Sequence, residues 1–133
     1  MTDGIAIADA AGQLALTSDT LRYYERAGLL LRPVPRSASG QRRYEDPDLA
    51  WIALITRLRA TDMPIREIRR YADLVRAGAG NEQERLELLQ AHRQVVLTQL
   101  ADVTAHLGAI EQKIGIYEDA LDVERAPRSC LDP

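Results

Sequence analysis

The sequence predicts a mainly α-helical protein with a helix-turn-helix head, a wing and a long C-terminal helix. Three observations support this fold class. The 133 residues contain no Phe and only 5% aromatics, so the core must consist of Leu, Ile, Val and Ala, which favours helices over a β-sandwich. Helix-capping residues alternate with Gly and Pro breaks between Thr17 and Gly80. A heptad pattern of apolar residues follows them.

The first two helices are expected over residues 5–14 and 18–27. Residues 5–14 form an Ala-rich amphipathic stretch. Thr17, Ser18 and Asp19 carry short side chains that accept hydrogen bonds from the free N–H groups of a helix start. Gly28 ends the second helix because glycine adopts the left-handed cap conformation at little cost. Two short helices joined in this way predict a helix-turn-helix.

Residues 29–44 break the helical pattern and predict a hairpin, or wing, with a long loop. The turn residues there are Pro33, Pro35, Ser37, Ser39 and Gly40. Pro47, flanked by two aspartates, opens a third helix. The break at Met63 and Pro64 separates it from a fourth, so a head domain is expected over residues 5–76.

A long helix is expected over residues 81–121, followed by a disordered tail over residues 122–133. From Val96 onward the apolar steps alternate four and three, which is the pattern of a coiled coil. An exposed apolar stripe of this length would aggregate, so we expect a homodimer. A hairpin folded back at Gly108 or Gly115 is the alternative. The expected dimerisation residues are Leu89, Val96, Leu100, Val103, Leu107, Ile110, Ile114 and Tyr117.

The charge distribution favours a polyanion as the partner of the head. The chain carries a net charge of -3, but residues 1–76 hold 12 Arg against 10 acids, and residues 77–133 hold 5 basic and 10 acidic residues. Residues 20–44 contain six Arg and a single acid, Glu25. A basic head on a dimerising helix is the arrangement of a protein that binds palindromic DNA. The second helix and the wing would present Ser18, Asp19, Thr20, Arg22, Tyr23, Tyr24, Arg42, Arg43 and Tyr44.

Several other classes of protein are disfavoured. The sequence has no run of 18 apolar residues and no signal-peptide pattern, so a cytoplasmic protein is expected. It shows no carboxylate pair, nucleophile–base arrangement or Gly-rich phosphate loop, so we expect neither an enzyme nor a cofactor. A metal site is not expected either, because Cys130 is the only cysteine and His92 and His106 lie about 21 Å apart along a helix.

The segments LRYYERAGLL, residues 21–30, and SGQRRY, residues 39–44, strongly resemble the MerR family of bacterial transcription regulators. The resemblance implies a winged helix-turn-helix head, a second wing made by the third and fourth helices, and an antiparallel coiled-coil dimer. It also implies a mechanism. The dimer sits on an over-long promoter spacer and, in response to an effector, bends and untwists the DNA so that RNA polymerase can engage both promoter elements.

The resemblance also implies roles for particular residues. Arg22 and Arg42 would hold phosphates, while Tyr23 and Tyr24 would lie at the DNA backbone or bases and Tyr44 would support the wing. The recognition segment begins at Thr17, and the second wing would add Arg57, Arg59 and Arg66. The alternative for Tyr23, Tyr44 and Trp51 is that they fill the core. For Arg26, Arg32, Arg36, Arg69, Arg70 and Arg76, a solvated or ion-paired face is expected instead of DNA contact.

The effector is less defined. Metal-sensing members carry cysteines around the start of the long helix, where this chain has none. The sequence resembles a short subgroup linked to aldehydes and other electrophiles, but Arg57 occupies the place of its thiol. A small-molecule pocket is expected near Trp51 and Tyr71, and Cys130 is expected to be incidental. The alternative function is a coiled-coil interaction adaptor whose head binds protein.

Overall fold

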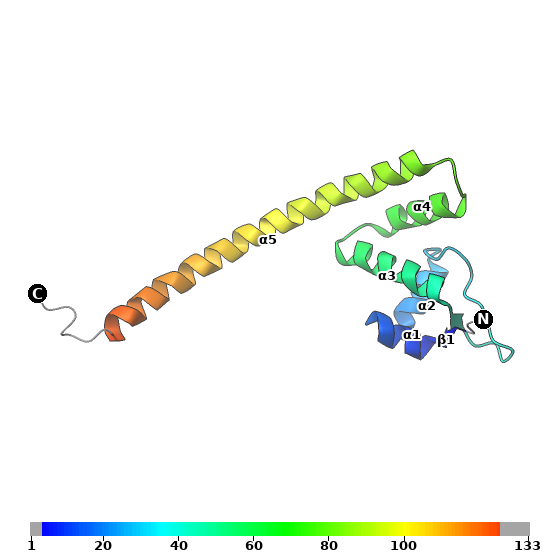
Figure 1. Cartoon of the computed structure of the whole chain (residues 1–133), viewed down its shortest axis with the longest axis horizontal. Helices are drawn as coiled ribbons and strands as arrows, with labels where there is room; N and C mark the ends of the chain where they lie inside the picture. The colour runs from blue at the N-terminus through cyan, green and yellow to red at the C-terminus, as the bar shows by residue number, and fades with distance from the viewer. Residues whose placement is uncertain (1–3, 126–133) are drawn as a thin grey trace, which may run out of the picture. The chain divides into compact units, whose positions relative to one another are not determined.

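The computed structural model describes residues 4–125 and confirms the mainly helical fold (Figure 1). The chain divides into two compact units, residues 1–92 and residues 93–133. Its elements, in order, are β1 (Ile5–Ala6), α1 (Ile7–Leu14), α2 (Ser18–Arg26), β2 (Arg43–Tyr44), α3 (Asp46–Ala60), α4 (Ile65–Arg76) and α5 (Glu82–Arg125). No helix in the described part of the chain is long and apolar enough to cross a membrane.

The N-terminal boundary differs from the prediction, because residues 5–6 form a strand instead of the first turn of a helix. Strand β1 pairs antiparallel with β2, with Ile5 opposite Tyr44 and Ala6 opposite Arg43. The expected hairpin within residues 29–44 is reduced to a single bridge between Arg36 and Arg42. The last strand of the wing therefore pairs with the start of the head, and this pairing satisfies the backbone groups of both segments.

The core of the first unit lies between α1, α2, α3 and α4. Its largest fully buried side chains are Tyr44, Leu21, Leu29, Ile52, Ile55, Met63 and Ile68. Helix α2 contributes Leu21 and Tyr24 to this core, and its two ends are set by capping features that the sequence predicted. The Thr17 hydroxyl accepts the N–H of Thr20 at 3.1 Å, and Gly28 ends the helix at a φ of 74°.

Replacing Gly28 with Ala should lower the free energy of unfolding by about 1–2 kcal/mol, because the left-handed conformation crowds a Cβ against its own backbone. The added Cβ would lie 3.7 Å from Arg69 Nε, so no steric clash contributes. Urea unfolding measures the change. Gly12→Ala is the matched control, since Gly12 lies within α1 with open space around it and should be neutral or stabilising. Equal stability of Gly28→Ala and the wild type would contradict the prediction.

Helix α5 runs to Arg125, beyond the predicted end at Leu121. The sequence has no helix breaker before Pro127, so the helix includes the first residues of the expected disordered tail. The remainder of that tail, residues 126–133 with Cys130, lies outside the described residues. The helix continues through Gly108 and Gly115, which rules out the folded-back hairpin.

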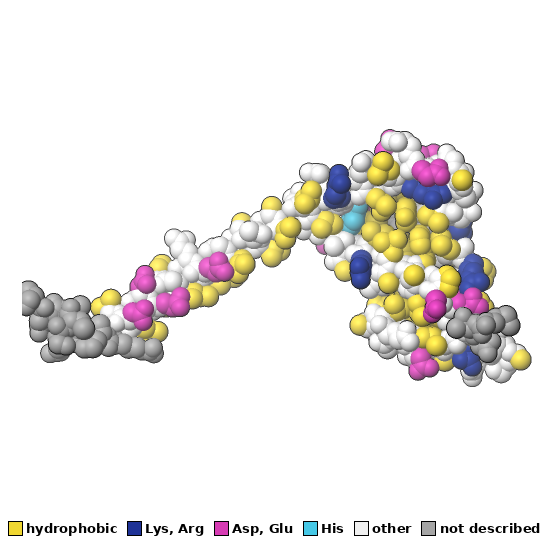
Figure 2. Space-filling view, in the orientation of Figure 1, with side chains coloured by type: hydrophobic (Ala, Val, Ile, Leu, Met, Phe, Trp, Pro, Cys, Tyr) yellow, Lys and Arg dark blue, Asp and Glu magenta, His cyan; other side chains and the backbone are white. Residues whose placement is uncertain are grey.

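The second unit exposes a row of large apolar side chains along α5 (Figure 2). Val96 is half-buried, and the exposed members at the heptad spacing are Leu100, Val103, Leu107, Ile110, Ile114, Tyr117 and Leu121. Leu89 was expected to belong to this stripe but packs against the core of the first unit instead. The stripe of the second unit therefore begins at Val96.

Candidate nucleic-acid interface

Helix α2 presents a polar outer face. Asp19 is almost fully exposed and accepts an ion pair from Arg22 at 3.0 Å, while Tyr23 is 43% exposed. The Thr17 and Thr20 hydroxyls lie 2.9 Å apart at the start of the helix, beside half-buried Ser18. This face combines a carboxylate, a guanidinium and hydroxyl groups, which can hydrogen-bond to base edges and phosphates.

A basic hollow lies where α1, α2 and the wing meet. Its volume is about 400 Å³, and its lining residues are Ala6, Ile7, Ala8, Arg22, Arg36, Gly40, Gln41 and Arg42. Three guanidinium groups therefore share one concave surface with the start of α1. The N-cap residue of that helix, Ala6, makes no side-chain hydrogen bond to the helix start, and the first N–H groups of the helix add partial positive charge. Such a surface suits a phosphate of a nucleic-acid backbone.

Glu25 ties α2 to the wing beside this hollow. One carboxylate oxygen accepts Arg42 Nε at 2.9 Å and lies 3.8 Å from Arg36, and the other accepts the N–H of Val34 at 2.9 Å. Burial acts to raise the pKa of Glu25, but the Val34 hydrogen bond and the two arginines outweigh it and lower the pKa below its ordinary value. The carboxylate is therefore ionised and holds the wing arginines in position. In the sequence, Glu25 stands out as the single acid of residues 20–44, but the pattern predicts no role for it.

Two of the expected DNA contacts are buried. Tyr24 is 5% exposed and Tyr44 is 1% exposed, and both belong to the hydrophobic core. The Tyr44 hydroxyl has no hydrogen-bond partner among residues 4–125, and burial raises its pKa. Burial of most of its ring leaves Tyr24 little surface for the expected DNA contact, which stays a prediction, and Tyr44 fills the core from strand β2. Of the three tyrosines, Tyr23 faces outward.

The three arginines expected in a second wing, Arg57, Arg59 and Arg66, are all exposed. Arg59 also donates from a terminal guanidinium nitrogen to the carbonyl of Met63 at 3.0 Å, where it satisfies the turn that follows α3. Arg43 is half-buried in β2. The three second-wing arginines thus keep the exposure that a DNA contact requires, and Arg59 is in addition bonded to its own turn.

Arg32 is ion-paired, as expected for that group of arginines. It makes two 3.0 Å hydrogen bonds to the Asp48 carboxylate and one of 2.6 Å to Glu45. Arg69 and Arg76 of α4 were expected to face solvent or form ion pairs. Both are exposed as expected, and Arg76 pairs with Asp73. Their guanidinium groups also reach the carbonyl groups that follow α2.

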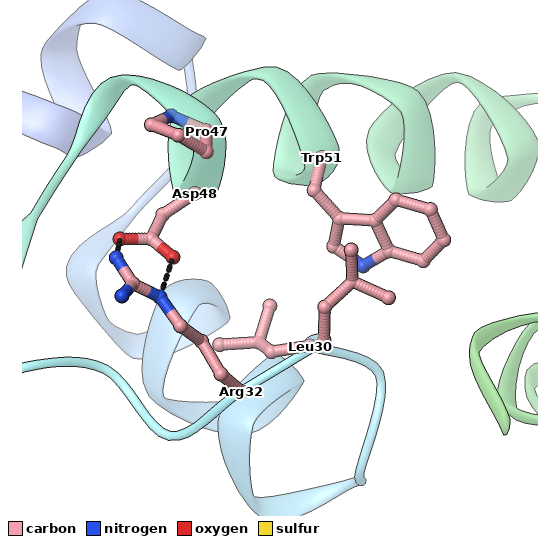
Figure 3. A pocket seen from close by; sticks show the side chains of 6 residues that line it. Leu30, Arg32, Pro47, Asp48 and Trp51 are labelled. Atoms are coloured by element: carbon pink, nitrogen blue, oxygen red, sulfur yellow. Dashed lines mark hydrogen bonds and ion pairs between the residues drawn. The ribbon is translucent and has the colours of Figure 1, made fainter. Parts of the chain in front are cut away.

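The hollow beside Trp51 has other lining residues than the expected effector pocket near Trp51 and Tyr71. The Trp51 and Tyr71 rings stack with centroids 5.6 Å apart, and Trp51 Nε1 donates to the carbonyl of Leu29 at 2.7 Å. A hollow of about 110 Å³ adjoins Trp51 (Figure 3). It is lined by Leu30, Leu31, Arg32, Pro47, Asp48 and Trp51, and Tyr71 does not line it. The hollow is smaller than the roughly 300 Å³ at which ordinary ligand pockets begin.

His92 is buried at the C-terminal end of the first unit. Its Nε2 lies 2.7 Å from the Thr61 hydroxyl, so the imidazole fixes the end of α3. Among residues 4–125, no three His, Cys, Asp or Glu side chains are grouped closely enough to hold a metal ion.

The fold and this basic surface match known proteins. The family model described as "MerR HTH family regulatory protein" matches residues 5–74, and one described as "MerR, DNA binding" matches residues 49–113. An uncharacterised HTH-type transcriptional regulator of Haemophilus influenzae is 34% identical over 113 residues, which are 85% of this chain and 83% of that protein. The regulator AdhR of Bacillus subtilis is 40% identical over 88 residues, which are 66% of this chain and 62% of AdhR.

Solved structures agree with these relatives. The crystal structure of HiNmlR, a MerR family regulator lacking the sensor domain and bound to promoter DNA, has a TM-score of 0.76 and 33% identity, and covers 90% of this chain and 94% of that one. A MerR family regulator from Listeria monocytogenes has a TM-score of 0.79 and 28% identity, covering 92% and 100%. The chain is therefore a helix-turn-helix DNA-binding transcriptional regulator and not an enzyme. It belongs to the MerR family.

Proposed function

We propose that this regulator binds promoter DNA as an antiparallel homodimer and distorts an over-long promoter spacer in response to an effector, so that RNA polymerase can engage both promoter elements. The observation that carries DNA contact is the basic hollow, where Arg22, Arg36 and Arg42 share a concave surface with the start of α1. A backbone phosphate would occupy this hollow while the outer face of α2 lies in the adjacent major groove. Promoter DNA is the ligand of the similar protein HiNmlR.

The dimer is supported by the exposed stripe of α5. Seven large apolar side chains from Leu100 to Leu121 are each between 46% and 62% exposed in the single chain. A second copy of the same helix would cover them, because an antiparallel pairing in which the two residue numbers sum to 217 places Leu107 opposite Ile110, Val103 opposite Ile114 and Leu100 opposite Tyr117. Two heads joined in this way suit a palindromic site.

Spacer distortion requires only a modest difference between two protein states. Bending a short DNA site costs on the order of 1–6 kcal/mol. An effector that prefers one state by that amount would switch the DNA between its two shapes.

Arg22→Gln tests the proposal, because Arg22 gives up only an exposed ion pair with Asp19 and should lose a phosphate contact. Fluorescence anisotropy on the protein's own upstream DNA should show weaker binding. The slope of log affinity against log salt should fall by about 0.9 for each contact, or about 2 for a dimer. Arg70→Gln, with the same charge change on α4, should keep the wild-type slope. Absence of wild-type binding at low salt, or an unchanged slope for Arg22→Gln, would contradict the proposed phosphate contact.

A further inference from the structure

We propose that Arg69 and Arg76 of α4 are positioning residues for DNA binding, which hold the turn that follows α2, and through it α2 itself, in its DNA-reading position. The inference rests on the proposed role of α2 as the recognition helix. Arg69 Nε donates to the carbonyl of Ala27 at 2.8 Å. One terminal nitrogen of Arg76 donates to the carbonyl of Gly28 at 3.3 Å and also to that of Leu30.

Together with Trp51, the two arginines hydrogen-bond to a row of consecutive backbone carbonyl groups. Trp51 Nε1 donates to the carbonyl of Leu29, so each of the four consecutive carbonyl groups of residues 27–30 accepts a hydrogen bond from a side chain of α3 or α4. Ala27 is the C-cap of α2, and the carbonyl groups of residues 28–30 lie beyond the helix, where no helical N–H group is in register to bond to them. Cationic side chains at this C-terminal end also interact favourably with the helix dipole. The end of α2 is therefore fixed by side chains of two helices that follow the wing in the sequence.

The turn held in this way leads directly into the wing. Residues 27–34 join α2 to the wing, and the far end of this segment is held by the hydrogen bond from the Val34 N–H to Glu25. The last turn of α4 is in turn bonded to residues around the start of α5 within the same unit. Asn81, which precedes α5, donates to the carbonyl of Leu74 at 2.9 Å. Arg85 of α5 donates to the same carbonyl at 3.5 Å and to that of Gly78, which follows α4. A displacement of the start of α5 would thus reach the recognition helix through α4.

Positioning and phosphate contact predict different salt dependence. If Arg69 and Arg76 held phosphates, replacing them would release fewer counterions and lower the salt slope. If they hold the turn, replacement lowers the fraction of protein in the binding-competent conformation. The apparent Kd then rises in inverse proportion to that fraction, and the slope is unchanged.

The test compares Arg69→Gln, Arg76→Gln and the double variant with Arg70→Gln, whose wild-type side chain lies 3.9 Å from Glu84 and contacts none of the four carbonyl groups. On the wild-type DNA, each single variant should bind about tenfold more weakly, and the double variant more weakly still, with the wild-type salt slope. Arg70→Gln should stay within about twofold. Arg22→Gln, measured on the same DNA, reports separately on the proposed phosphate contacts.

Trp51 provides a second readout in the free protein, because it is the only tryptophan and bonds to the same turn. Its emission should shift to the red in the Arg69 and Arg76 variants and stay in place in Arg70→Gln.

Folded Gln variants with wild-type affinity, or with a salt slope lowered as in Arg22→Gln, would overturn the inference. Should circular dichroism show that they do not fold, Arg76→Lys replaces them. Lysine keeps the charge but lacks the rigid guanidinium fork, so about three- to fivefold weaker binding is expected, and wild-type affinity would overturn the inference.

Discussion

Replacing Leu107 and Ile110 together with Asp should convert the proposed dimer into a monomer and weaken DNA binding by about 100-fold or more. The two side chains are 50% and 57% exposed in the single chain and would lie at the centre of the paired helices. Each buried Leu or Ile contributes about 1.5–3 kcal/mol, and carboxylates placed in an apolar layer add a desolvation penalty. The two heads would then bind their half-sites independently, losing an advantage of roughly 10²–10⁴ in affinity.

Sedimentation velocity and anisotropy measure the two parts of this prediction. Thr98→Asp with Gln112→Asp is the matched control, because both residues are exposed on the opposite side of the heptad and add the same charge. This control should remain dimeric and bind DNA. The Trp51 emission should match the wild type in both double variants, which shows that the head is intact. A wild type that sediments as a monomer at micromolar concentration would contradict the dimer, as would a Leu107/Ile110 variant that remains dimeric.

Local signals predicted the helices well and the strands poorly. The hydroxyl cap at Thr17, the left-handed Gly28 and the Pro47 helix start are each determined by residues next to one another, and the structure places each of these helix boundaries close to its predicted position. Strand β1 is very short and depends on a partner, β2, that follows the wing loop in the sequence. Nothing in the local pattern of residues 5–6 encodes that pairing, so the amphipathic stretch favoured a helix.

The candidate interface, like the fold, could be predicted from the sequence only in part. The arginines of the basic hollow stand out in the sequence, and so does Glu25 as the single acid among them. Helical periodicity could have distinguished buried Tyr24 from exposed Tyr23. Tyr24 lies one helical turn after the buried Leu21 and shares its face. The carbonyl contacts of Arg69 and Arg76 were not predictable. Backbone carbonyl groups leave no mark in a sequence, and an arginine that binds one is indistinguishable from an arginine that faces solvent.

Glu25→Gln should weaken DNA binding by about tenfold even though it removes a negative charge beside the DNA. Charge alone predicts the opposite result. Glutamine still offers an oxygen to the Val34 N–H, but it loses the ionic hydrogen bond that holds Arg42 and the charge that faces Arg36. Hydrogen bonds of this kind contribute about 1.5–3 kcal/mol, and without this one the wing arginines leave the geometry of the basic hollow. Anisotropy at fixed salt measures the change.

Asp19→Asn is the control with the same charge change on the same helix. Asp19 is exposed and, within residues 4–125, forms an ion pair with Arg22 alone, so its replacement frees a guanidinium and should tighten binding by about two- to threefold. Opposite signs for the two variants would show that Glu25 acts by holding the wing. Tighter binding by both would mean that Glu25 acts only through its charge.

Stability against pH provides an independent check on Glu25. Because its pKa is lower in the folded protein than the ordinary 4.5, its contribution is complete above that value and is lost as the pH falls below it. Between pH 7 and 5 the difference in unfolding free energy between the wild type and Glu25→Gln should therefore be constant, at about 1–2 kcal/mol. Below about pH 4.5 the wild type should lose this advantage, because protonated Glu25 also lacks the charge that pairs with Arg42. A difference that persists unchanged to pH 3 would contradict the ionised role of Glu25.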